Sequence, residues 1–215
     1  MMKKNGFTLA EVLITLAIIG VVATLTLPSL MSNTAEQQAL TSYKKIINTL
    51  TEAGQLNSAM EGFDYTAATA AGAFADNADA GSSTLSAIIN ARTQVNRQTA
   101  GAVYNTTTGS NHCNVAPVFT LRDGTGICIG GATVATANRP FALIWVDTNG
   151  PKAPNRESTC TTEGCTDRSG KQIYDQFPVT LYQGTAIPGH WTAVNTDGAT
   201  ASDRAARYAM GVSQR

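Results

Sequence analysis

Charged residues are scarce in this sequence, and neither sign is in excess. Of the 215 residues only 14% are Asp, Glu, Lys or Arg, and fifteen basic residues balance fifteen acidic ones. A chain without a basic excess lacks the electrostatic footprint of a nucleic-acid-binding protein, and it has no run of acidic residues that would make a solvated tail. We therefore expect no nucleic-acid partner.

The sequence also lacks the motifs of common catalytic sites. It has no G-x-S-x-G, no P-loop and no H-E-x-x-H, and its two histidines, His112 and His190, lie far apart in the chain. We expect no enzyme. A membrane-anchored hydrolase stays open as an alternative, because residues that are distant in sequence can meet in a fold.

Cysteine is absent from the first half of the chain. Cys113, Cys128, Cys160 and Cys165 all lie in the turn-rich second half, where an even number of cysteines favours disulfides if the domain is exported. We predict Cys113–Cys128 and Cys160–Cys165, although the count allows three pairings. A zinc site is the rival, but paired C-x-x-C spacing is missing and only His112 lies near a cysteine.

A long apolar segment stands out against this background. From Phe7 to Leu30 the only charged residue is Glu11. As a helix, these 24 residues would span about 36 Å, enough for the roughly 30 Å hydrocarbon core of a bilayer. Lys3 and Lys4 precede the segment and place the N-terminus on the cytoplasmic side. The remainder of the chain is then expected on the other side of the membrane.

Glu11 separates the possible interpretations of this segment. A secretory signal peptide needs a small-residue cleavage site after the apolar stretch, and none of good quality is present. A plain membrane anchor gives no reason for a carboxylate, which costs a few kcal/mol within a bilayer and usually has a partner. Cleavage between Gly6 and Phe7 would supply that partner, because the new α-ammonium of Phe7 lies one helical turn from Glu11. The ammonium could be the chain's own or that of a neighbour in a helical bundle.

These residues carry a family resemblance. The segment KKNGFTLAEVLITLAIIGVVATLTLPSL resembles the leader and N-terminal helix of type IV pilins and type II secretion pseudopilins, including Gly6, Phe7, Glu11, Gly20 and Pro28. The resemblance implies cleavage by a prepilin peptidase after Gly6, N-methylation at the new N-terminus, and a contact from Glu11 to an adjacent subunit.

Gly20 and Pro28 also have a physical meaning of their own. Glycine weakens a helix by about 1 kcal/mol relative to alanine, and proline removes a backbone donor and clashes with the preceding turn. The stretch from Gly20 to Pro28 is therefore a place where the helix can kink or locally lose its hydrogen bonds.

Beyond the apolar segment, the pattern predicts an α+β fold. One helix is expected from Phe7 to about Met60, because apolar residues recur at three- and four-residue steps: Leu40, Tyr43, Ile46, Ile47, Leu50, Ala53, Leu56 and Met60. A second helix is expected near Leu85, Ile88 and Ile89. Strands are expected at 115–121, 126–130, 141–146 and 176–182, with a hairpin turn at 122–126.

The predicted architecture is a long helix packed on a small antiparallel sheet with disulfide-bonded loops. Four regions follow: a leader at 1–6, an apolar transmembrane and assembly helix at 7–30, an amphipathic half of the helix at 31–60, and a globular head at 61–215. No motif is evident in 62–112, and 183–215 shows few strand signals.

A second, weaker resemblance lies in the head. Residues 145–155, WVDTNGPKAPN, are similar to a DVNG-x-KGPN segment of some pilin and pseudopilin C-terminal domains, although Gln172 departs from the acidic position of that pattern. In pseudopilins a calcium ion orders this region, so the resemblance implies a calcium site at Asp147, Asn149, Asp167 and Asp175. Calcium prefers such oxygen ligands, but Asp-Thr-Asn-Gly is also an ordinary turn sequence, and both interpretations stay open.

The sequence thus predicts a structural filament subunit, held by a single span in the inner membrane with the head outside before it enters an extracellular or periplasmic filament. Its expected partners are other copies of itself or related pilins, the prepilin peptidase and methylase, and an inner-membrane assembly platform. The alternatives are a pseudopilin of a type II secretion system and a membrane-anchored surface binding protein that uses the pilin export route.

Overall fold

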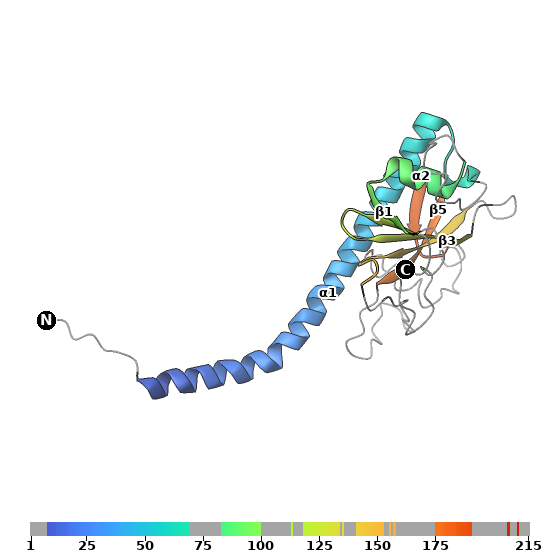
Figure 1. Ribbon diagram of the computed structural model, residues 1–215. Helices are drawn as coiled ribbons and strands as arrows, with labels where there is room; N and C mark the ends of the chain where they lie inside the picture. The colour runs from blue at the N-terminus through green and yellow to red at the C-terminus, as the bar shows by residue number, and fades with distance from the viewer. Residues whose placement is uncertain are drawn as a thin grey trace. The chain divides into compact units, whose positions relative to one another are not determined.

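The computed structural model divides the chain into two units, residues 1–37 and residues 38–215 (Figure 1). It describes residues 8–68, 83–99, 118–133, 141–152 and 175–190, together with Cys113, Ala135, Asn155, Glu157, Ala206 and Met210. The predicted cleavage residues Gly6 and Phe7 lie outside the described residues, as do Cys160, Cys165 and Asp167.

One helix, α1, runs from Leu9 to Glu61 without a break. The predicted single helix from Phe7 to about Met60 is therefore confirmed for its described part. Gly20 and Pro28 both lie inside this continuous helix. The single chain keeps its helical conformation across the stretch where the sequence predicts a weak point, and local melting of that stretch stays a prediction.

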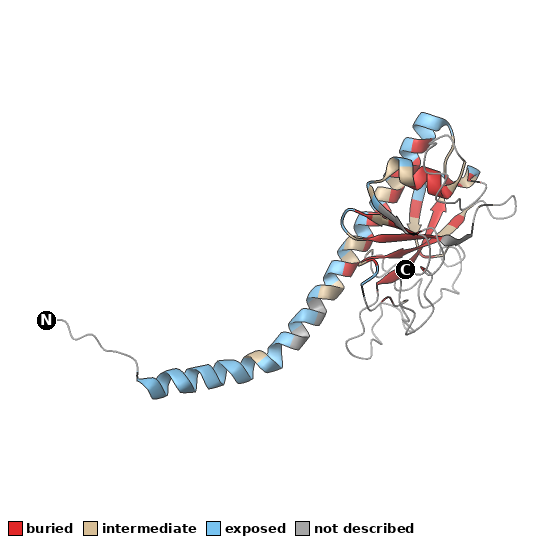
Figure 2. Ribbon diagram, in the orientation of Figure 1, coloured by how far each residue is buried: buried red, intermediate tan, exposed pale blue. Residues whose placement is uncertain are grey.

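The first unit contains the apolar part of α1, whose large side chains have no protein to pack against among the described residues. Leu9 is 77% exposed, Ile14 is 60% exposed and Leu25 is 76% exposed, and Figure 2 shows the exposed surface along this part of the helix. The span Leu9–Leu27 has a mean hydropathy of 2.3 and is long and apolar enough to cross a membrane. Exposed apolar surface on this scale indicates a non-aqueous environment for the segment.

The second unit contains a six-stranded antiparallel sheet in which each strand pairs with the next along the chain. The strands are β1 (Val95–Thr99), β2 (Val118–Leu121), β3 (Gly126–Thr133), β4 (Ala142–Asp147), β5 (Gln176–Tyr182) and β6 (Thr185–Pro188). A short 3₁₀ helix, η1 (Tyr65–Ala67), and a helix α2 (Leu85–Arg92) precede the sheet in sequence. The α+β prediction is confirmed.

The core of this unit forms between α1, α2 and one face of the sheet. Alternate residues of each strand point to the same face, and these include Phe119, Ile127, Ile144, Val146, Phe177, Val179 and Leu181, all buried with Ile46, Leu50 and Ile88 from the helices. Two tyrosines fix the layers through their hydroxyl groups, because Tyr43 donates to the carbonyl of Pro178 at 2.8 Å and Tyr65 donates to that of Leu50 at 2.6 Å.

The predicted apolar stripe of α1 is wrong at its C-terminal end. Leu56 is 43% exposed and Met60 is 66% exposed, whereas Gly54 and Asn57 are buried. The reason is η1, whose Tyr65 ring packs against α1 at Gly54. The side of the helix that includes Gly54 and Asn57 is therefore buried in its last two turns. Asn57 is accommodated because its amide donates to the Phe63 carbonyl at 3.0 Å.

The second face of the sheet carries a smaller cluster around a disulfide. Cys113 and Cys128 are bonded and buried with Val118 and Trp145, and Trp145 lies directly opposite Cys128 in the sheet. This confirms the first predicted disulfide. The second, Cys160–Cys165, falls outside the described residues and stays a prediction.

Several strands and α2 agree with the sequence prediction, and two strands were missed. β5 has the predicted bounds, β3 and β4 differ from them by up to three residues, and the described part of the first predicted strand is β2. The missed strands are β1 and β6, the two edges of the sheet. Both are short: β1 reads VNRQT, which is mostly polar, and β6 reads TAIP, which ends in a proline, so neither has the apolar alternation that marks a strand.

Gly54→Ala should destabilise the second unit although alanine is the better helix former. A Cβ atom at position 54 would lie 2.5 Å from Tyr65 Cε2 and 3.0 Å from the Gly184 carbonyl oxygen, and overpacking of this kind costs about 1–3 kcal/mol. Urea denaturation of the full chain in detergent, followed by tryptophan fluorescence, measures the effect. Gly20→Ala is the matched control, because a Cβ there would meet no atom within 4 Å. Equal midpoints for the two variants would contradict the close contact.

Removing the disulfide should lower the free energy of unfolding by about 3 kcal/mol. The two cysteines are 15 residues apart, and the bond between them closes a loop of that length and so reduces the entropy of the unfolded chain. The double variant Cys113→Ala with Cys128→Ala should therefore unfold at a lower urea concentration than the oxidised wild-type chain. The same reductant added to both proteins should shift the wild type more than the double variant, because both retain the predicted Cys160–Cys165 bond and only the wild type also has Cys113–Cys128. A wild-type midpoint that equals that of the double variant before reduction would contradict the prediction.

Candidate assembly site at the N-terminus

Glu11 caps the helix in which it lies. The Thr8 N–H and the Thr8 hydroxyl both donate to Glu11 Oε2 at 2.8 Å, and the Glu11 N–H donates to Thr8 Oγ1 at 3.3 Å. The Thr8 carbonyl accepts the first helical hydrogen bond, from the Val12 N–H at 3.3 Å. This is a capping box, which satisfies N–H groups that a helix start leaves without partners.

Thr8 is the functional residue that the sequence prediction missed. Its signal is legible, because Thr8 and Glu11 have the spacing of the S/T-x-x-E capping motif directly before an apolar run. The carboxylate therefore has a role within its own chain before any second subunit is considered. Only Oε2 makes these bonds, and within residues 8–68 no hydrogen bond to Oε1 is found.

The predicted site residues on this helix lie on one continuous element. Glu11 is in its first turn, and Gly20 and Pro28 lie further along α1. Thr15, Thr24 and Thr26 turn their hydroxyls back onto carbonyls of the preceding turn, at 2.8–3.0 Å. The polar side chains of the span are thereby satisfied within the helix, which lowers the cost of placing them in lipid. Glu11 is the one charged side chain between Leu9 and Leu27.

A second predicted site lies at the end of β4 and the start of β5. Asp147 and Asp175 are both buried, and the structure brings them close enough for their charges to interact. Asp147 accepts hydrogen bonds from the Asn149 N–H at 3.2 Å and from Gln176 Nε2 at 3.1 Å, and Asp175 accepts one from the Asn155 N–H at 2.8 Å. Asn155 holds a left-handed backbone conformation, with φ of 48°, to make this contact.

Burial, together with the neighbouring charge of Asp175, raises the pKa of Asp147 to about 8. Two buried carboxylates side by side need a proton or a cation between them. Their oxygens are of the type that calcium prefers, so the donor chemistry fits the predicted ion. Among the described residues, however, no group of three or more His, Cys, Asp or Glu side chains could hold a metal. Asp167, the third predicted carboxylate, is not among them.

The stability of the second unit should fall between about pH 4 and pH 8 in calcium-free buffer. The folded-state pKa of Asp147 lies above its ordinary value of 3.8, so its contribution is fully present below pH 4 and is lost as the pH rises through 8. Asp147→Asn should flatten this part of the profile, because the amide carries no charge and Gln176 can reverse its own amide to keep the hydrogen bond. Urea midpoints measured with a chelator present test this, and equal slopes for both proteins would contradict it.

The comparisons with known proteins bear on the N-terminal site. Residues 1–27 match the prokaryotic N-terminal methylation motif. No curated protein and no solved structure matches the chain. The match includes the capping box of Thr8 and Glu11 and the apolar span Leu9–Leu27. The chain therefore carries at its N-terminus the methylation motif that is typical of type IV pilins and type II pseudopilins.

Proposed function

We propose that the chain is a structural subunit of a type IV pilus-like filament, cut after Gly6 by a prepilin peptidase and N-methylated at Phe7. The observation that carries the proposal is the single carboxylate of Glu11, fixed in the first turn of an apolar and exposed helix within the methylation motif. An apolar span alone would anchor the protein in the inner membrane before export. The carboxylate adds a specific partner requirement.

Cleavage would change what Glu11 faces. Before cleavage, Phe7 is joined to Gly6 by a peptide bond. After cleavage, the chain begins at Phe7 with an ammonium group. Glu11 Oε2 is already engaged by Thr8, so Oε1 is the oxygen placed to accept from an ammonium. In a parallel bundle of such helices, pairing with the neighbour's ammonium would fix the axial offset between subunits. The pair would form in a low-dielectric interior, where an unpaired charge is costly.

The regions of the chain then take separate roles. We assign residues 1–6 to the leader, 7–30 to the membrane span and assembly helix, 31–60 to the amphipathic half of the helix, and 61–215 to the head. The partners in this scheme are other copies or related pilins, the prepilin peptidase and methylase, and the inner-membrane assembly platform. The filament would be extracellular or periplasmic.

A pseudopilin of a type II secretion system is the second candidate. The observation in its favour is the buried pair of Asp147 and Asp175, since a divalent cation there would neutralise both carboxylates. We propose Asp147, Asn149, Asp167 and Asp175 as its ligands. A calcium-dependent rise in the urea midpoint of the wild-type chain, absent in Asp147→Asn, would support this candidate, and an unchanged midpoint would count against it.

Two substitutions at Glu11 separate capping from charge pairing. Glu11→Gln keeps an oxygen that can accept from Thr8 but loses the charge, and Glu11→Ala loses both. Because an ammonium left without its carboxylate in an apolar bundle costs several kcal/mol, both variants should enter filaments at a level reduced by more than about tenfold. Export and the urea midpoint of the head should not change. Quantitative immunoblotting of sheared filaments and of membranes gives both numbers.

The outcomes are distinct. Normal filament incorporation of Glu11→Gln, with a loss only in Glu11→Ala, would mean that capping of the helix is sufficient and that the charge pair is wrong. Failure of both variants to reach the membrane would mean that Glu11 acts in export. Absence of the wild-type chain from any filament would contradict the proposed function itself.

A further inference from the structure

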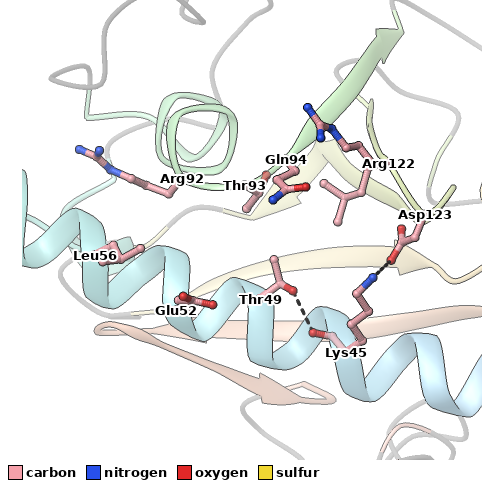
Figure 3. A pocket seen from close by; sticks show the side chains of 10 residues that line it. Lys45, Thr49, Glu52, Leu56, Arg92, Thr93, Gln94, Arg122 and Asp123 are labelled. Atoms are coloured by element: carbon pink, nitrogen blue, oxygen red, sulfur yellow. Dashed lines mark hydrogen bonds and ion pairs between the residues drawn. The ribbon is translucent and has the colours of Figure 1, made fainter.

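A groove of about 380 Å³ opens on the surface of the second unit. One wall is α1, which contributes Lys45, Glu52 and Leu56, and the opposite wall is formed by the end of α2 and the β2–β3 turn. Figure 3 shows these side chains facing each other across the groove. None of them belongs to the assembly site or to the buried carboxylate pair.

The groove has more cations than anions along its lining, with Lys45, Arg92 and Arg122 against Glu52 and Asp123. Lys45 and Asp123 neutralise each other in an ion pair of 2.7 Å. Arg122, beside Asp123, is exposed and makes no ion pair or hydrogen bond with the part of the chain that the structure describes. An exposed guanidinium on a tight turn offers a planar, bidentate donor to a carboxylate.

Arg92 is held in place at the other end of the groove. Its Nη2 donates to Glu61 at 2.6 Å and its Nε donates to Asn57 Oδ1 at 3.2 Å, and its side chain is only 11% exposed. Both partners lie on α1, so the arginine joins α2 to α1. A guanidinium fixed in this way loses little conformational entropy when it binds a further acceptor.

Apolar surface adjoins these cations. Leu56 lies in the groove and is 43% exposed, and Met60, one helical turn further along α1, is 66% exposed. Within the part of the chain that the structure describes, this end of α1 is therefore open. A surface that combines apolar side chains with arginines has the composition of a protein–protein contact.

We propose that this groove receives the acidic stretch around Asp76 and Asp79 of a second copy of the chain. Every charged residue from 61 to 91 is acidic, and residues 70–80, AAGAFADNADA, have two carboxylates, an aromatic ring and otherwise small residues. This composition complements both the cations and the apolar wall of the groove. The inference rests on the proposed function, because a filament holds the heads of neighbouring copies close together.

A charge-reversal rescue tests the pairing. Arg122→Glu, and separately Asp76→Lys with Asp79→Lys, should each lower filament yield at least about tenfold, because like charges then oppose each other in the contact. Combining all three substitutions should restore the yield. Lys44→Glu is the matched control, since Lys44 is an exposed cation next to Lys45 that does not line the groove, and its yield should stay normal.

Photo-crosslinking identifies the occupant. The probe p-benzoylphenylalanine in place of Leu56 should give a product of dimer mass in filaments, with the crosslink mapping to residues 70–80 of the second copy. A product of monomer mass would mean that the chain's own stretch fills the groove, and a product with a different protein would mean a different partner. Either result, or no rescue by the triple variant, overturns the proposal.

The two proposals fail separately. Wild-type filaments that contain the chain but give no dimer crosslink at position 56 contradict the groove contact alone. A wild-type chain that is processed at Phe7 but never enters a filament contradicts the proposed function, and the contact between copies falls with it.

Discussion

The arrangement of this chain depends on one constraint, which is that a carboxylate inside an apolar helix needs a partner. Glu11 has a first partner in its own chain, because Thr8 donates to it twice and closes the start of α1. That contact uses one oxygen of the two. In the proposed filament, the other oxygen would accept from the ammonium of a neighbouring subunit. In that proposal, the apolar surface from Leu9 to Leu27 would face lipid before assembly and the neighbouring helices afterwards.

The head is built to hold the second half of the same helix. Tyr43, on α1, donates to the Pro178 carbonyl of β5, and Tyr65, on η1, donates to the Leu50 carbonyl of α1, so hydrogen bonds as well as apolar packing hold the helix to the sheet and to η1. On the other face of the sheet, the Cys113–Cys128 bond ties down a loop beside Trp145. The apolar span and the part of the helix that packs on the sheet belong to one element, because α1 is continuous from Leu9 to Glu61.

Local signals made much of this predictable from the sequence. The apolar run, the 3.6-residue pattern from Leu40 to Ala53 and the β-rich segments depend on neighbours in the chain, and each appears in the structure. Contacts between distant segments were not predictable. Tyr65 packs against α1 at Gly54, and Leu56 and Met60 are exposed. The spacing of apolar residues along the helix could not predict this contact. The edge strands were missed for a related reason, since their short sequences become strands only by pairing with a neighbour in the sheet.

The candidate sites divide in the same way. The methylation motif is contiguous and could be recognised in the sequence. The capping spacing of Thr8 and Glu11 is also present in the sequence, but it was not used to predict a role for Thr8. The groove between Arg92 and Arg122 joins residues 30 positions apart in the chain and needed the fold. The buried pair of Asp147 and Asp175 was anticipated only through a resemblance, and the structure adds that the two carboxylates are close and buried.

Mass spectrometry of the N-terminal peptide, from protein sheared off the cell surface, tests the central claim most directly. The account predicts a peptide that begins at N-methylated Phe7, with Glu11 in its fifth position. A peptide that begins at Met1 or Met2, or one that begins after the apolar segment, would contradict it. The first would indicate a plain anchor and the second a secreted domain.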